Sequence, residues 1–191
     1  QDVIIYKYNK DGTLLWTVQL GSTEEDLGND ISVDTNNNIY ITGHFRNIMY
    51  WEDDSLASSG NTDAFVAKLN SQGDIEWVKA IGSTGYETGN AIWCDMSGDL
   101  IIGGTFEDSL TLDNQTFQTY GTLNNFILKL NNAGNLIWHN SISTPIFNNL
   151  QDIKTDIFGN VFLIGYFKDF LSHSLGQLIG HGGKDAMLLK F

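Results

Sequence analysis

The acidic stretch STEEDLGND gathers four carboxylate side chains that suit a hard cation: Glu24, Glu25, Asp26 and Asp30. Calcium takes about six to eight oxygen ligands, so carboxylates clustered at a strand connection are able to converge on one ion. The stretch matches no EF-hand pattern. Clusters of this kind are more often solvated acidic loops than metal sites. Calcium is therefore the one cofactor that we consider, and we expect no other.

Two tryptophans are candidates for binding a ligand. Trp51 lies in the stretch MYWEDD, where an aromatic ring beside three carboxylates could stack on a sugar while the carboxylates accept its hydroxyl groups. The alternative is an amphipathic edge strand that covers its own sheet. Trp93 occupies a position that varies along the chain, where Ser32 and Lys154 stand at the equivalent places. A variable position on an inner strand is where a ligand-facing residue is expected.

The residues that usually carry catalysis show no converging pattern. The four histidines are dispersed, and we find no Gly-x-Ser-x-Gly elbow, phosphate loop or paired cysteine motif. The glycine-rich stretch GHGGKD precedes a strand rather than a helix, so it is a weak phosphate site. Cys94, the single cysteine, is expected as a small buried side chain in a strand. We therefore predict no catalytic residues and a protein that is not an enzyme.

The charge balance narrows the range of partners. The 191 residues carry 23 acidic and 10 basic side chains, for a net charge of −13. A nucleic-acid binder needs a basic footprint, which is absent from the sequence. No apolar run approaches the length of a membrane span. A hydrophobic content of 41% is enough for a sizeable core, so a folded domain with protein or glycan partners is expected.

These residues are set in a sequence that repeats every 61 positions without a gap. We expect one repeat domain, 1–191, with units of about 2–62, 63–123 and 124–184, and with 185–191 starting a fourth. The same residue types recur at that spacing, in the series Gly12, Gly73 and Gly134; Trp16, Trp77 and Trp138; Asp34, Asp95 and Asp156; Gly43, Gly104 and Gly165. Each copy therefore needs the same residue at the same place.

Each unit contains four segments with the alternation of antiparallel strands. In the middle unit they are DAFVAKL, DIEWVKAIG, GNAIWCD and LIIGGTF, separated by turns rich in Gly, Asn and Asp. No capped helical period is present, so the fold class is all-β. Residues 107–122 are expected as a short edge strand or an irregular loop. Four-stranded antiparallel units of this length indicate β-propeller blades, or less often a stacked array.

The recurring residues have structural explanations. Asp34 and its equivalents each end a strand, where the carboxylate can accept backbone N–H groups in an Asx-turn. Gly43 and its equivalents interrupt a strand, which marks a bulge or the close approach of another backbone. Trp16 and its equivalents lie at one register of a strand and are expected to fill the same gap between neighbouring units. Metal binding by the aspartates and sugar stacking by the tryptophans are the alternatives.

The stretches GSTEEDLGNDISVDTNNNIYITG, GSTGYETGNAIWCDMSGDLIIGG and NTDAFVAKLNSQGDIEW resemble the bacterial β-propeller repeats called SBBP repeats. The resemblance covers nearly the whole chain. It implies a β-propeller in a large secreted or cell-surface bacterial protein, no enzyme activity and no catalytic residues to transfer. The third unit departs from it, with SISTPIFNNLQD where the others have GST and acidic residues.

In related propellers the strand like GNAIWCD is innermost and the strand like LIIGGTF is second. The chain is then expected to begin with strands three and four of a blade and to end with strands one, two and three. Its last strand repeats its first and would leave an edge open to pairing, formed by Asp185, Met187, Leu189 and Phe191. We expect a structural, adhesive or partner-binding segment outside the cell. A self-assembling filament or ring and a carbohydrate-binding module are the alternatives.

Overall fold

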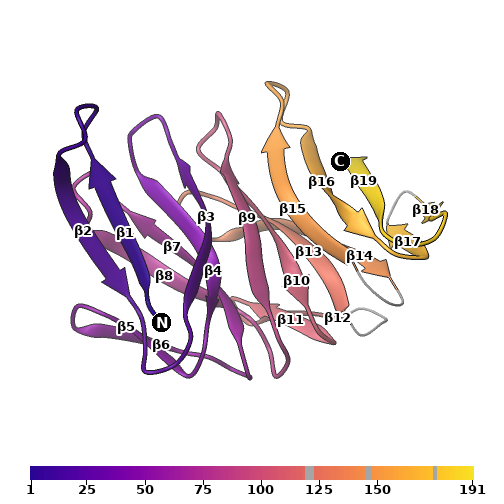
Figure 1. Ribbon diagram of the computed structural model, residues 1–191, viewed down its shortest axis with the longest axis horizontal. Coiled ribbons are helices and arrows are strands. Elements are labelled where there is room, and N and C mark those ends of the chain that lie inside the picture. Colours follow the sequence, from indigo (N-terminus) through magenta and orange to yellow (C-terminus); the bar gives the residue numbers. More distant parts are fainter. Residues whose placement is uncertain (119–122, 145–147, 174–175) are drawn as a thin grey trace.

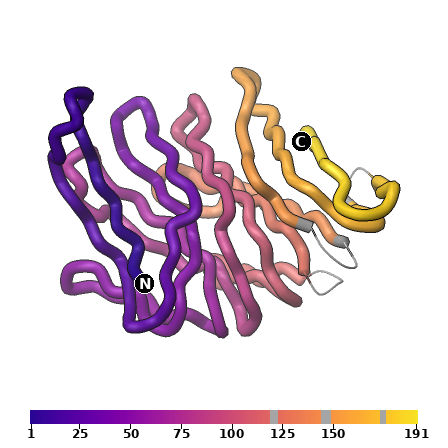
Figure 2. Tube along the Cα trace, viewed as in Figure 1, coloured from indigo at the N-terminus to yellow at the C-terminus, as the bar shows by residue number. Residues whose placement is uncertain are grey.

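Four successive antiparallel blades and three small hairpins build the described part of the molecule. The computed structural model describes residues 1–118, 123–144, 148–173 and 176–191. All regular secondary structure within these ranges is β-strand. The sheets follow one another along the chain as a fan of blades (Figure 1). They form an open row, and the two ends of the chain lie at opposite sides of it (Figure 2). The all-β prediction is confirmed.

The two middle sheets are complete four-stranded blades. The spatial order of the four strands in each blade follows the chain, with the first strand innermost; in the second blade a strand of a later hairpin, Phe170–His173, also pairs with the fourth strand. The strands of the first complete blade are β3 (Leu27–Val33), β4 (Ile39–Phe45), β7 (Asp63–Leu69) and β8 (Ile75–Ile81). Those of the second are β9 (Thr88–Cys94), β10 (Leu100–Phe106), β13 (Leu123–Leu130) and β14 (Leu136–Thr144).

The two outer sheets have fewer strands. The first sheet pairs β1 (Val3–Tyr8) with β2 (Leu14–Leu20), which correspond in the repeat to strands three and four. The last sheet holds β15 (Asn148–Thr155), β16 (Val161–Phe167) and β19 (Asp185–Lys190), which correspond to strands one, two and three. The expected assignment of strands to blades is therefore confirmed.

A small β-hairpin follows the second strand of each blade. The three hairpins are β5–β6 (Ile48–Trp51 and Asp54–Ala57), β11–β12 (Ser109–Leu112 and Gln115–Gln118) and β17–β18 (Phe170–His173 and Gly176–Ile179). Residues 107–122 thus hold two strands where one strand or a loop was expected. Residues 119–122 of that stretch lie outside the described residues.

The turn between strands one and two is built by its aspartate, as predicted. Asp34 Oδ1 accepts the backbone N–H groups of Asn36 and Asn38 at 2.8 Å each. Asp95 and Asp156 hold their own turns through the same two positions. Satisfying these amides locally lets each tight turn project from the sheet without unpaired donors.

The strand glycines allow a close approach between backbones, also as predicted. A Cβ atom at Gly43 would overlap the carbonyl oxygen of Leu27 on the neighbouring strand, and Gly104 faces Thr88 in the same way. The register shifts beside both contacts, which identifies a β-bulge. A side chain at these positions would therefore force the first two strands of the blade apart.

The core lies between the blades rather than within one. Three clusters of buried apolar residues fill the three successive gaps. Trp16 packs in the first gap and Trp77 in the second, each at the same strand position. Because each blade buries a face against its neighbour, the row gains stability as a stack of interfaces.

Candidate functional site

The acidic loop does not form one cluster. Asp26 is fully buried, and its carboxylate accepts the backbone N–H of Ser22 at 2.6 Å and that of Arg46 at 3.3 Å. Glu24 and Glu25 are exposed. Among the described residues no three His, Cys, Asp or Glu side chains are grouped to hold a metal ion. The geometry lends no support to a calcium ion shared by the four carboxylates, and that site stays a prediction.

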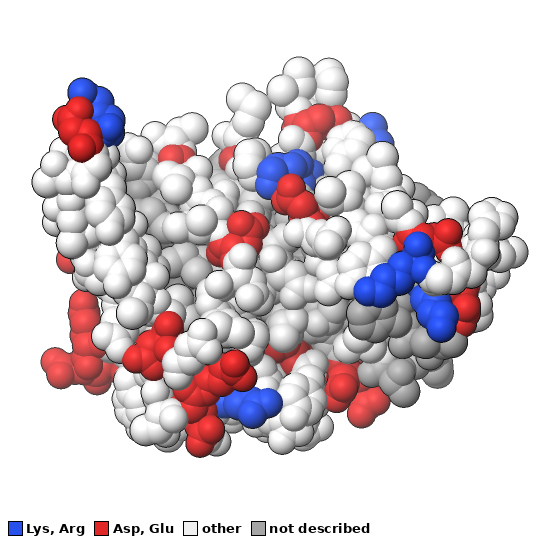
Figure 3. All heavy atoms as spheres, in the orientation of Figure 1, with Lys and Arg blue, Asp and Glu red and all other residues white. Residues whose placement is uncertain are grey.

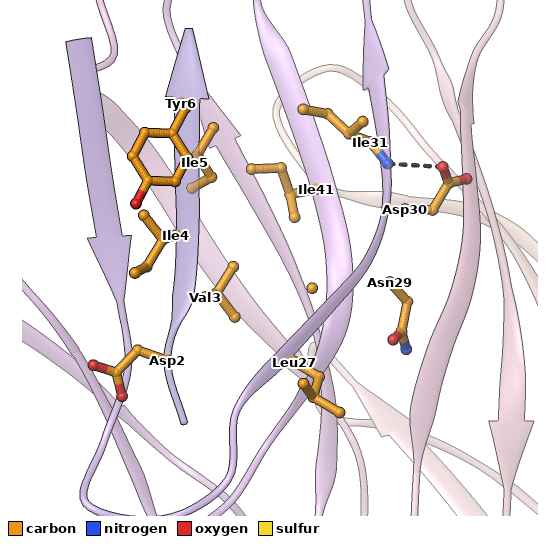
Figure 4. A pocket seen from close by; sticks show the side chains of 11 residues that line it. Asp2, Val3, Ile4, Ile5, Tyr6, Leu27, Asn29, Asp30, Ile31 and Ile41 are labelled. Atoms are coloured by element: carbon orange, nitrogen blue, oxygen red, sulfur yellow. Dashed lines mark hydrogen bonds between the residues drawn. The ribbon is translucent and has the colours of Figure 1, made fainter.

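Asp30 connects two blades instead. Its Oδ2 accepts the backbone N–H of Ile92 on β9 at 2.8 Å, and its Oδ1 accepts its neighbour Ile31 N–H at 2.8 Å, the bond drawn in Figure 4. The side chain therefore spans the gap between the innermost strands β3 and β9. This use of the carboxylate explains its place on an inner strand without a metal.

Trp51 belongs to the edge hairpin. It ends β5, is partly buried and packs against the apolar cluster between the first two sheets. Glu52, next in the turn, has a positive φ of 49°. These observations fit the edge-strand interpretation of the stretch. Sugar stacking by Trp51 would need a freer ring face.

Trp93 lies on the innermost strand β9, as expected, but it is engaged with the next blade. The Lys154 ammonium group stands 4.5 Å from the centroid of its ring, and its Nε1–H donates to Thr155 Oγ1 at 3.0 Å. Lys154 also forms an ion pair with Asp152 at 2.7 Å. The site is a contact between β9 and β15 that places one cation over an aromatic ring.

Sequence reasoning missed a second set of bonds between the innermost strands. The Asn29 side chain donates to the carbonyl oxygen of Gly89 at 2.8 Å, and Asn90 donates to that of Leu150 at 3.1 Å. The donors are 61 residues apart, and so are the acceptors. The repeated asparagine was the available signal, but its partner is visible only once the blades are packed.

The four residues of the predicted assembly edge lie on or next to β19, and their role in assembly stays a prediction. Met187 and Leu189 are buried against the preceding blade, whereas Ala186, Leu188 and Lys190 are exposed. Asp185 Oδ2 accepts the backbone N–H of His181 at 3.0 Å, and the Phe191 backbone pairs with Val161. The four residues therefore hold β19 in its own blade, and only the outer backbone edge of β19 is available for pairing.

The rim of the strand-one to strand-two turns carries large apolar side chains in water. Met96 is 81% exposed in the turn after β9, and Ile157 and Phe158 are 77% and 83% exposed in the turn after β15. The two turns are neighbours on the upper rim in Figure 1. At the equivalent places the first complete blade has the polar residues Thr35 and Asn36.

Two buried carboxylates lie on the opposite rim. Glu87 accepts the Ser83 N–H at 2.9 Å, and Asp63 accepts the N–H groups of Ser59 and Gly60 at 2.9 and 3.2 Å. Burial raises the pKa of Glu87 to about 7, and the nearby Asp63 carboxylate adds to that rise. Both side chains organise the loops between blades.

The charged surface matches the composition. Acidic side chains are spread over the face in Figure 3, and the few basic ones stand singly or in small groups. No described segment is a helix that could cross a membrane. The molecule presents no basic face to a nucleic acid in this view.

Residues 15–44 match the SBBP family model, described as a beta-propeller repeat. This confirms the family resemblance over β2, β3 and β4, the outermost strand of one blade and the first two strands of the next. The matched segment therefore crosses a boundary between blades, which is consistent with the packing of one blade on the next.

Two curated relatives are much longer than this chain. It is 24% identical over 188 residues to an uncharacterized WD repeat-containing protein, L264, of Acanthamoeba polyphaga mimivirus, a match that covers 82% of this chain and 14% of that protein. It is 26% identical over 113 residues to the regulatory protein FlaEY of Caulobacter vibrioides, a match covering 57% and 12% respectively.

A solved structure supports the fold alone. The chain is similar to the crystal structure of a protein of unknown function from Bacteroides caccae, with a TM-score of 0.50 and 12% sequence identity. The similarity covers 94% of this chain and 52% of that one. This chain thus spans about half the length of its structural neighbour.

Proposed function

We propose that this open row of β-propeller blades is a non-enzymatic segment that binds a protein partner on the rim formed by its strand-one to strand-two turns. The observation that carries the proposal is the exposure of Met96, Ile157 and Phe158 on that rim. The segment acts in adhesion or in organising a larger protein, and no reaction is assigned to it.

The turn geometry does not require these apolar side chains. Asp95 and Asp156 already satisfy the backbone amides of the two turns, and the equivalent turn folds with Thr35 and Asn36 at its tip. Apolar groups held in water at a rim are typical of an interaction site. A methionine and an aromatic ring are also residue types enriched in protein interfaces.

Lys154 and Trp93 add a polar and an aromatic contact near the same rim. Each lies two residues before the aspartate that begins its turn, Asp95 for Trp93 and Asp156 for Lys154. A partner with an acidic side chain beside an apolar one would match this arrangement. A WD repeat-containing protein among the relatives is consistent with partner binding, since repeat propellers commonly present such surfaces.

The test is a comparison of three immobilised chains exposed to proteins from the surface and medium of the source cells. The first is the natural chain, the second carries Met96→Ser, Ile157→Ser and Phe158→Ser, and the third carries Ile179→Ser. Ile179 is 75% exposed on the hairpin strand β18, so it is a matched control for an exposed apolar group elsewhere.

We expect one or a few proteins to be retained by the natural chain and by the Ile179→Ser chain, and to be lost from the triple variant. Unchanged thermal unfolding of all three chains shows that the substitutions act on the surface. Retention of the same proteins by the triple variant would contradict the proposed rim.

A location outside the cell is a second part of the proposal. It is supported by the similarity to SBBP repeats over residues 15–44. It is also supported by the acidic surface, because like charges on separate molecules repel one another and keep them in solution. The measurement is digestion of intact cells with an added protease. Degradation of the segment while cytoplasmic markers survive is expected, and protection until lysis would overturn the location.

A further inference from the structure

Arg46, the only arginine in the sequence, carries a guanidinium group that is held in place but not neutralised. It follows β4, on the rim opposite to the strand-one to strand-two turns (Figure 1). Within the described ranges the cations that form ion pairs are lysines and the terminal amino group, and Arg46 forms none. Because Arg46 is only partly exposed, its charge is partly shielded from water and gains from a negative group that a ligand brings.

Two contacts fix the orientation of the guanidinium group. Its Nε–H donates to Thr62 Oγ1 at 3.1 Å, and its Cζ atom lies 5.8 Å from the centroid of the Tyr86 ring. None of the residues that the structure describes accepts a hydrogen bond from its Nη groups. With Nε bound on one side and an aromatic ring beside it, the arginine keeps its Nη groups for another acceptor.

Both supports of the guanidinium group are themselves fixed. Thr62 is buried, and its carbonyl oxygen accepts the backbone N–H of Glu87 at 2.8 Å. Thr62 and Tyr86 also pair as an isolated β-bridge. Three segments of chain therefore meet here: the end of β4, the start of β7 and the loop before β9. An arginine held at such a junction loses little conformational freedom when a ligand binds, which favours affinity.

The repeat shows that the blades do not need this arrangement. At the equivalent places the other units have different residues: Glu107 and Lys168 for Arg46, Leu123 for Thr62, and Glu25 for Tyr86. A contact that the blade required would recur every 61 residues, as the aspartate turns do. The three residues therefore serve a purpose that is specific to one unit rather than the architecture that all units share.

We propose that Arg46 binds the carboxylate of an acidic side chain on a protein partner, with Tyr86 as the neighbouring aromatic contact. A guanidinium group matches a planar carboxylate in shape and charge through paired N–H···O bonds. Arginine and tyrosine are enriched among the residues that dominate the affinity of protein interfaces. Tyr86 is 43% exposed, so part of its ring is open to the partner. The site lies opposite the apolar turns and is independent of the rim assigned above to a protein partner.

The surroundings favour a protein carboxylate over a phosphate or a sugar. The Asp26 carboxylate accepts the Arg46 backbone N–H at 3.3 Å. Glu107 lies against Gly85, next to Tyr86, where a Cβ atom would stand 3.0 Å from its side chain. These acidic groups repel a phosphate, with about −1.5 to −2 charges at pH 7, more strongly than a singly charged carboxylate. The guanidinium group also covers one face of the Tyr86 ring, which leaves less of it for stacking on a sugar.

The first test follows Arg46 by NMR spectroscopy in the isotope-labelled natural chain. Since the sequence has one arginine, its Nε–H signal is assigned without a variant. The probe is a short capped peptide with a single glutamate, added at low ionic strength, and the reference is the same peptide with glutamine. We expect a saturable shift with the glutamate peptide and binding about tenfold weaker or less with the glutamine peptide, because its amide carries no charge. An equal shift with the glutamine peptide or with sodium chloride alone would overturn the proposal.

The second test uses two variants to separate the shape of the guanidinium group from its charge. Arg46→Lys keeps the charge but loses the paired N–H donors, so it should bind the glutamate peptide about fivefold more weakly, as read from the Tyr86 backbone N–H signal. Lys168→Gln removes an exposed cation at the equivalent place of another unit and should bind as the natural chain does. Unchanged affinity of Arg46→Lys, or an equal loss in Lys168→Gln, would contradict a site at Arg46.

Glucuronate and inorganic phosphate, titrated in the same way into the natural chain, test the choice of ligand. We expect both to shift the Arg46 signal less than the glutamate peptide does at equal concentration. Tighter binding of glucuronate would assign the site to an acidic glycan, and tighter binding of phosphate would assign it to a phosphorylated ligand. Either result would overturn the assignment to a protein carboxylate.

Discussion

The ammonium group of Lys129 lies 2.9 Å from Asp95 Oδ2, and the two side chains are only 17% and 5% exposed. Asp95 builds the turn between β9 and β10, while Lys129 comes from β13, the third strand of the same blade. A second carboxylate, that of Asp99, lies 3.1 Å from the same ammonium group. The lysine therefore joins an inner turn to the middle of the blade.

Replacing Lys129 by Met should lower the free energy of unfolding by about 1–3 kcal/mol at pH 7, because it leaves a mostly buried carboxylate without its cation. Urea unfolding followed by tryptophan fluorescence measures the change. Lys10→Met is the matched control, because the Lys10 side chain is 90% exposed and should contribute little. Equal stability of the two variants would contradict the role given to Lys129.

The same pair should make stability depend on acid pH. Burial alone would raise the pKa of Asp95, but the hydrogen bonds from Lys129 and from backbone N–H groups outweigh it and hold the pKa below its usual value. A lowered pKa stabilises the fold above the unfolded value of about 3.9, and this contribution is lost as pH falls below it. The difference between the natural chain and Lys129→Met should shrink below about pH 4.

The contribution of Glu87 to stability should depend on pH in the opposite direction to that of Asp95. Burial raises the pKa of Glu87 to about 7, so between its unfolded value and 7 the folded state binds a proton that the unfolded state has released. Its effect on stability is therefore favourable at low pH and is lost as pH rises toward 7. Glu87→Gln places a neutral amide at this position at all pH values, which mimics the protonated carboxyl group.

Melting curves of the natural chain and Glu87→Gln should thus diverge as pH rises from about 4.5 to 7.5, with the variant gaining about 1–3 kcal/mol relative to the natural chain. Glu25→Gln, which alters an exposed glutamate, is the control and should give a constant difference. A constant offset for Glu87→Gln across this range would show that Glu87 is ionised throughout in the folded protein.

The repeat made the blades predictable because the residues that define them act locally. Asp34 satisfies amides two and four residues away, and the Gly43 position is dictated by the adjacent strand. Each effect lies within one hairpin and recurs every 61 residues. Strand order and turn chemistry could therefore be predicted without the structure.

The functional candidates were less predictable because contacts between blades decide them. The carboxylate of Asp26, a predicted cation ligand, accepts the backbone N–H of Arg46, 20 residues further along the chain, a contact that the sequence alone does not show. Trp93 was correctly placed on an inner strand, whereas its contact with Lys154, 61 residues on, depends on how two blades meet. The exposure of Phe158 is likewise a property of the packed molecule.

The Asn90 bond across the blade boundary should contribute measurably to stability. Asn90→Ala removes the hydrogen bond that Asn90 donates to Leu150 O and the one that it accepts from Thr88 Oγ1, at a cost of about 1 kcal/mol. Gln151 stands at the same repeat position on β15 and is exposed, so Gln151→Ala should change stability by less than about 0.5 kcal/mol. Chemical unfolding of both variants tests this, and an equal loss would assign the effect to the strand position alone.

The close approach at Gly104 should be the least tolerant position of the second complete blade. A Cβ atom there would overlap both the carbonyl oxygen of Thr88 and the ring of Phe126, which are held by strands on either side. Neither neighbour can move without opening the blade, so Gly104→Ala should cost about 2–3 kcal/mol or more. Gly98→Ala is the matched control: its Cβ position is open, and its φ of +85° alone should cost about 1 kcal/mol. Thermal unfolding of the two variants gives the comparison, and a Gly104→Ala protein as stable as Gly98→Ala would show that the strands can separate at the bulge without loss.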